Sequence, residues 1–151
     1  MTSSADPALS DAARACLRCI AGHMIPASAE HGVPGADDPA VLAVMVASLN
    51  RDAPALRAVL AVVDKGAGGA LCTLTPDAQS VLLARMRTDN PGQFGVVESV
   101  VARAYYRDDR VLRAIGMDPR PPFPNGYAVE PGDWSLLDPV RARGPIHRDA
   151  G

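Results

Sequence analysis

The feature that most constrains this fold is a proline at the start of each of four apolar segments. These prolines are Pro39, Pro54, Pro76 and Pro91. Proline has a fixed φ and no backbone N–H, so it fits the first turn of a helix and breaks a helix further in. Asp38, directly before Pro39, is a residue type that caps helix N-termini. The four segments therefore predict separate helices that begin near their prolines.

Apolar residues recur at helical spacing within these segments, as on helices with one buried face. Nothing in the chain has the alternating pattern of a half-buried strand. The buried stripes that we expect are Val41, Leu42, Met45 and Leu49; Leu56, Val59, Leu60 and Val63; Val81, Leu82 and Met86; and Phe94, Val97, Val101, Ala104 and Tyr105.

Two more helices flank these four. Ser10 can cap a first helix that runs to about Met24, and Asp108 or Asp109 can cap a short one through Ile115. The sequence thus predicts an all-α fold, a small bundle of about five to six helices over residues 1–116.

The last part of the chain, residues 117–151, has a different composition. It holds seven of the fourteen prolines, a density that favours extended backbone over helix. It also contains large apolar side chains that a purely solvated tail would not need. We expect an extended proline-rich C-terminal arm that docks on a partner protein or back on the helices of the same chain. The expected partner-binding residues are Phe123, Tyr127, Trp134, Leu136 and Leu137.

The charge and composition disfavour several classes of function. A net charge of −2 and 4% aromatic residues give neither the basic field nor the stacking groups that nucleic-acid binding uses. No apolar run approaches the roughly 20 residues that span a bilayer. Three cysteines do not suggest a secreted disulfide framework. Because the start lacks a twin arginine and an apolar export segment, we expect a cytoplasmic protein.

A Cys-x-x-Cys with a histidine four residues later lies in the first predicted helix. At ~100° per residue, Cys16, Cys19 and His23 fall on the face opposite Arg14 and Arg18. That face should point into the core, where free cysteine packs as a small hydrophobe. The alternative is a thiol- or metal-dependent sensor using Cys16, Cys19 and His23, with Cys72 or His31 as a further ligand. Core packing is the favoured interpretation, and no metal ligand is assigned.

No cofactor-binding motif is complete. Gly66 and Gly68 match the start of a dinucleotide fingerprint, but Leu71 occupies the third glycine position and no strand precedes them. Asp108 and Asp109 are adjacent, so on a helix they point ~100° apart and do not form a carboxylate pair. We therefore expect no cofactor in this chain.

No catalytic residue is assigned either. His31 lies beside Glu30 in a loop rich in glycine and proline, and His147 lies in the terminal tail. Neither histidine has a recognisable nucleophile, and isolated loop histidines are mostly surface residues. An enzyme that uses Glu30 and His31 is the least favoured hypothesis.

Three motifs, in order, resemble one protein family. The segment "IPASAEHGVPGADDPAVLAVMVASL" carries Ile25–Pro26 and Pro34–Gly35–Ala36, "FGVVESVVARAYYRDDRVLRAIGM" carries a tyrosine before an Asp-containing turn, and "RPPFPNGY" carries Pro124, Gly126 and Tyr127. Together they are similar to the gluconate 2-dehydrogenase subunit 3 family, over roughly residues 15 to 130.

The resemblance implies a non-catalytic small subunit that stabilises an FAD-dependent dehydrogenase of the glucose-methanol-choline class. In that family the large subunit holds FAD and oxidises a sugar, glycoside or other alcohol, and some members also associate with a cytochrome subunit. Many members carry a twin-arginine signal. This sequence shows none, so a periplasmic location would require export by a signal on the partner.

Overall fold

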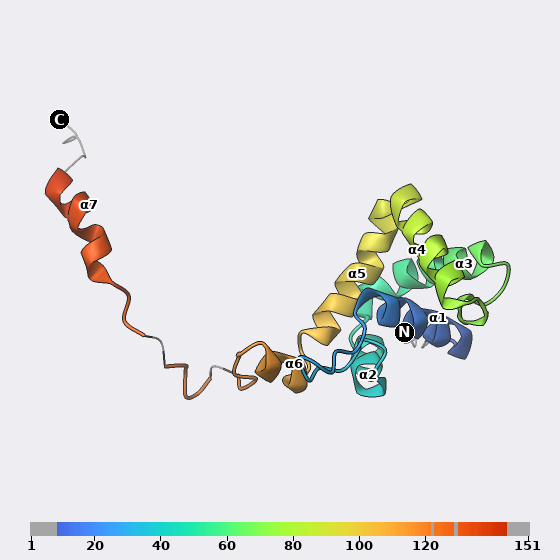
Figure 1. The fold of residues 1–151 in the computed structure, drawn as a ribbon, viewed down its shortest axis with the longest axis horizontal. Coiled ribbons are helices and arrows are strands. Elements are labelled where there is room, and N and C mark those ends of the chain that lie inside the picture. The colour runs from blue at the N-terminus through green and yellow to red at the C-terminus, as the bar shows by residue number, and fades with distance from the viewer. Residues whose placement is uncertain (1–8, 122, 129, 145–151) are drawn as a thin grey trace, which may run out of the picture. The chain divides into compact units, whose positions relative to one another are not determined.

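The computed structural model describes residues 9–121, 123–128 and 130–144. The chain divides into two compact units, residues 1–119 and residues 120–151 (Figure 1). The sequence placed the boundary after Gly116, and the division by contacts lies after Pro119. Each unit is described by itself.

The first unit is built from helices and short 3-10 turns. The all-α fold class is confirmed, and no named strand occurs in the described part of the chain. The elements are α1 (Asp11–Met24), α2 (Pro39–Ala47), η1 (Asn50–Asp52), α3 (Ala53–Gly66), η2 (Leu71–Thr73), α4 (Pro76–Asp89), α5 (Pro91–Tyr105) and α6 (Asp109–Ala114).

The helix starts follow the capping residues and prolines of the sequence. The side chains of Ser10, Asp38, Thr75 and Asp108 each accept a hydrogen bond from a backbone N–H in the first turn of their helix. These bonds satisfy donors that have no partner within the helix. Asn90 precedes α5 without such a side-chain bond.

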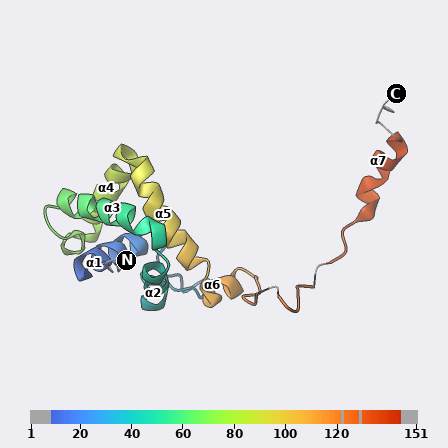
Figure 2. The same cartoon turned by 180° about the vertical axis from the view of Figure 1, so that it is seen from behind.

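Helix α5 is central to the core of this unit. It packs against α2, α3 and α4, while α1 packs against α3 and η2 (Figures 1 and 2). The core-facing side of α5 is apolar, and every α5 residue that the sequence predicted to point into the core is buried. Its buried residues are Phe94, Val97, Val100, Val101, Ala104 and Tyr105.

Helix α4 departs from the predicted stripe. Val81, expected inside, is 71% exposed, whereas Gln79 and Leu83 are the buried residues. Leu82 and Met86 are partly buried against the core. The buried face of α4 therefore differs from the predicted stripe. The prediction missed it because one of its residues is a glutamine, and a search for apolar residues does not select glutamine.

The second unit contains helical turns that its proline content did not predict. Residues 134–143 form η3 (Trp134–Leu137) and α7 (Asp138–Arg143), so the expected extended backbone is wrong for this stretch. The Asp133 side chain accepts from Ser135 N at 3.0 Å, which caps η3. Pro139 lies in the first turn of α7, where its missing N–H costs no helical hydrogen bond. In the described residues, no helix has the length and apolar character needed to cross a membrane.

Candidate functional site

The structure separates the three residues of the Cys-x-x-Cys-x-x-x-His motif. Cys16 is buried, with its Sγ 3.8 Å from the Leu60 carbonyl oxygen, and Cys19 is partly buried. His23 is exposed, so its placement on the buried face is wrong. It lies in the last turn of α1, where it lines the edge of a cleft.

Burial sets the protonation of the two motif thiols. It raises the pKa of Cys16 and that of Cys19, and the neighbouring Asp64 carboxylate raises both further. Both thiols are therefore protonated near neutral pH, and neither has the lowered pKa of a cysteine that attacks first. This agrees with core packing for Cys16.

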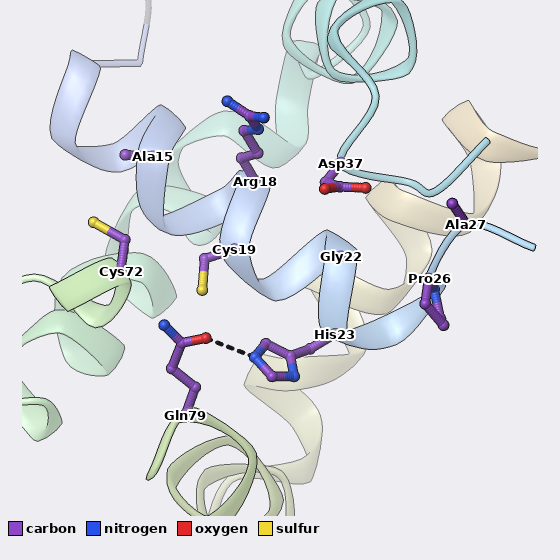
Figure 3. Close-up of a pocket in the computed structure, with 10 residues that line it drawn as sticks. All are labelled: Ala15, Arg18, Cys19, Gly22, His23, Pro26, Ala27, Asp37, Cys72 and Gln79. Atoms are coloured by element: carbon purple, nitrogen blue, oxygen red, sulfur yellow. Dashed lines mark hydrogen bonds between the residues drawn. The ribbon is translucent and has the colours of Figure 1, made fainter. Parts of the chain in front are cut away.

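A cleft of about 540 Å³ lies beside the end of α1 (Figure 3). Cys72, from η2, lines this cleft together with Cys19 and His23, whereas Cys16 does not. The residues that share the cleft are therefore Cys19, His23 and Cys72, and not the three residues of the sequence motif. Among the described residues, no group of three histidine, cysteine or acidic side chains is arranged to hold a metal ion.

Gln79 holds His23 at the edge of the cleft. The Gln79 Nε2 donates to the carbonyl oxygens of Leu71 at 3.2 Å and Leu74 at 3.0 Å, which turns its Oε1 toward the imidazole. That Oε1 lies 2.7 Å from His23 Nε2, so Nε2 carries the hydrogen (Figure 3). His23 Nδ1 is left as an acceptor, 3.5 Å from Ser80 Oγ.

This arrangement joins helices and does not activate a nucleophile. The Ser80 hydroxyl donates to the Pro76 carbonyl oxygen at 3.0 Å within its own helix. The hydrogen bond from His23 to Gln79 ties the end of α1 to the start of α4. Sequence reasoning missed Gln79, and the only available signal was a polar residue one turn before Leu83 on α4.

The loop between α1 and α2 is held by backbone hydrogen bonds within it and by a hydrogen bond from α5. Ala36 N donates to the Ile25 carbonyl oxygen at 2.8 Å, and Ser28 and Val33 exchange backbone hydrogen bonds of 3.1 Å. The Tyr105 hydroxyl, from α5, donates to the Pro34 carbonyl oxygen at 3.1 Å. These bonds hold Ile25 close to Ala36 and hold the loop against α5.

Arg110 joins the start of α2 to the start of α6. Its guanidinium donates to Asp38 Oδ1 at 2.9 Å and to Asp108 Oδ2 at 2.7 Å. These hydrogen bonds are the main reason that the pKa of Asp38 and that of Asp108 lie below the ordinary value. Asp108 therefore acts as a helix cap and ion-pair partner, held by the residue two positions later.

The remaining candidates lie in turns and loops. Glu30 and His31 are exposed, and the His31 backbone N–H donates to Ser28 Oγ at 3.3 Å. Helix α3 ends at Gly66 and no named strand precedes it in the described chain, so the glycines there lack the context of a dinucleotide fingerprint. His147 lies outside the described residues.

The large apolar side chains that the structure describes in the second unit are exposed. The exposed fraction is 85% for Phe123, 67% for Trp134 and 74% for Leu136, and Tyr127 and Leu137 are also exposed. The Tyr127 hydroxyl donates to the Arg120 carbonyl oxygen. Exposed aromatic and leucine side chains grouped in one segment are typical of protein-binding surfaces.

Comparisons of the chain with models of protein families, with curated proteins and with solved structures give no match.

Proposed function

We propose that this protein is a non-catalytic small subunit that binds and stabilises an FAD-dependent oxidoreductase of the glucose-methanol-choline class. FAD and the oxidation of a sugar, glycoside or other alcohol belong to the partner. The segment 120–144 supplies the main contact surface, and the helical unit is the folded body that carries it.

The observation that carries this proposal is the group of exposed apolar side chains in the second unit. Phe123, Trp134, Leu136 and Val140 are each more than half exposed. Aromatic side chains bury large areas and are frequent hot spots of interfaces. Proline restricts the free chain, so less conformational entropy is lost when such a segment docks. These are properties of a binding segment.

The motifs behind the family resemblance give a second line of support. Ile25 and Ala36 share a backbone hydrogen bond, and Tyr105 bonds to Pro34. Residues from two of the three motifs are thus in contact, although about 70 positions separate Pro34 from Tyr105. A fold shared with that family would bring these residues together, and the contacts agree with that expectation.

Co-expression with a candidate flavoprotein tests the proposal. The candidate is any large FAD-dependent dehydrogenase subunit that a neighbouring reading frame of the source genome is found to encode. We expect a complex that elutes together with stoichiometric flavin absorbance, and a loss of soluble flavoprotein when this chain is omitted. A flavoprotein whose yield, flavin content and activity are the same without this chain would contradict the proposal.

Substitutions in the second unit test where the partner binds. Trp134→Ala combined with Tyr127→Ala should weaken the complex by ~2 kcal/mol or more, since hot-spot truncations have costs of this size. Val81→Ala is the matched control, because Val81 is an exposed apolar residue of the helical unit. Isothermal titration gives both affinities. Equal affinities for the double variant and the control would contradict the role of the second unit as the contact surface. They would leave the proposed partnership to the co-expression test.

A further inference from the structure

We propose that Cys19 and Cys72 are a redox-active thiol pair, which closes to an intramolecular disulfide when the protein meets a low-molecular-weight disulfide such as oxidised glutathione. This inference does not depend on the proposed partner. It concerns the cleft beside α1.

The two thiols line the same cleft from elements that pack against each other. Cys19 belongs to α1 and Cys72 to η2, and these two elements are in contact. Figure 3 shows both side chains on neighbouring walls of the cleft, with the Cys72 sulfur turned away from Cys19. Because Cys72 is exposed on a short turn, its side chain has room to change rotamer, and closure of the proposed bond requires such a change.

The electrostatics agree with this proximity. After burial, the largest cause of the raised pKa of Cys19 is repulsion from the charged form of Cys72. Two thiolates that disfavour each other's ionisation lie within the range of a direct Coulomb interaction. The charged forms of Cys19 and Cys72 also raise the pKa of Cys16, so electrostatics alone do not select the pair. Cys16 is set apart by its place, because it is 1% exposed and does not line the cleft.

The reaction proceeds in two thiol–disulfide exchanges. The Cys72 thiolate, which is accessible, attacks one sulfur of the small disulfide, forming a mixed disulfide and releasing the first small thiol. Cys19 then loses its proton, its thiolate attacks the Cys72 sulfur, and the second small thiol leaves. The protein dithiol loses two electrons and two protons, and the small disulfide gains both. Cys19 reacts second because it is partly buried and protonated.

Closure would cross-link α1 to the turn that leads into α4. The bond joins residues 19 and 72 beside the hydrogen bond between His23 and Gln79, and it removes two S–H groups from the cleft. Pairs of this kind in reducing compartments are usually redox-sensing and not permanent.

Oxidation of the full-length reduced protein tests the pair. After treatment with oxidised glutathione, we expect the number of titratable thiols to fall from three to one without a change in oligomeric state. Trypsin cleaves after Arg18, so Cys16 and Cys19 fall in different peptides. Mass spectrometry should find the peptide that begins at Cys19 linked to the peptide that contains Cys72.

Three variants separate the possible outcomes. Cys16→Ala should still lose two thiols, whereas Cys72→Ser should lose none by intramolecular closure. Cys19→Ser should stop at the mixed disulfide on Cys72. A wild-type protein that remains at the mixed disulfide, forms only intermolecular dimers, links through Cys16 or does not react would overturn the proposal. Because Cys72 is exposed, Cys72→Ser keeps the comparison valid even where Cys19→Ser fails to fold.

Discussion

Gly35 shows how one residue fixes the path of the loop between α1 and α2. A Cβ atom at this position would lie 2.3 Å from Asp37 Oδ1, 3.0 Å from Ala27 N and 3.3 Å from the Ile25 carbonyl oxygen. The Asp37 side chain can move. The two backbone atoms are less free to move, because they lie beside the hydrogen bond from Ala36 N to the Ile25 carbonyl oxygen, which joins the two ends of the loop. Only glycine fits there without displacing the loop.

Gly35→Ala should therefore destabilise the protein by ~1–3 kcal/mol, the usual cost of overpacking. Urea denaturation measures the change. Gly95→Ala is the control with the opposite sign, because Gly95 lies inside α5 with open space around the position of its missing Cβ. It should stabilise the helix by ~0.5–1 kcal/mol. A Gly35→Ala protein as stable as wild type would show that the loop adjusts freely.

Gln79 stabilises the fold through hydrogen bonds to the groups that surround its side-chain amide. Its amide is buried and satisfies two backbone carbonyls and one imidazole. Gln79→Leu keeps the volume but leaves the buried Leu71 carbonyl without this donor. We expect a loss of ~1–3 kcal/mol in the free energy of unfolding, measured by urea denaturation. Gln93→Leu, at an exposed position of α5, should change it little. Equal effects of the two substitutions would contradict the role given to Gln79.

At the scale of elements, ion pairs join helix starts. Asp38 caps α2 and Asp108 caps α6, and Arg110 bonds to both carboxylates. Arg110 thus links two N-cap residues, each of which already bonds to the backbone of its own helix.

The pH dependence of stability reports this arrangement. A carboxyl group whose folded-state pKa is lowered adds stability above its unfolded-state value of about 3.9, and that stability is lost as the pH falls through the folded-state pKa. Arg110 lowers the pKa of Asp38 and that of Asp108. Arg110→Met should therefore destabilise the protein near neutral pH, and its difference from wild type should shrink in acid below the ordinary aspartate pKa.

Urea denaturation at both pH values measures this difference. Arg113→Met is the matched control, because Arg113 pairs with Asp109 on the same helix but both side chains are more than half exposed. Its effect should be small at either pH. A difference for Arg110→Met that stayed constant into acid would contradict the role of the two carboxylates.

At the scale of the whole molecule, all of the buried core belongs to one unit. The buried apolar side chains fall between Leu9 and Val111, and the described residues of 120–151 add none. If residues 120–151 bind a partner, as proposed, the stability of the helical unit should not depend on the second unit.

Deletion of residues 120–151 should leave the helical signal and the unfolding midpoint of the helical unit unchanged, with a free-energy change within ~0.5 kcal/mol. Circular dichroism with urea titration measures both. Val111→Ala is the positive control, because it removes buried methyl groups and should cost ~1–3 kcal/mol. A large loss on truncation would mean that the second unit covers this chain's own helices instead of a partner.

The sequence by itself determined the α-helices of the first unit. Asp38 before Pro39 and Thr75 before Pro76 act through bonds to the next few residues, so their effect can be read locally. The inward face of α5 was also predictable, because its apolar residues alone define it. Only the tertiary structure decided which face of α4 is buried, the exposure of His23 and the placing of Cys19 and Cys72 on one cleft. The reason is physical: each of these depends on contacts between distant segments, and a local pattern carries no information about which neighbour will cover it.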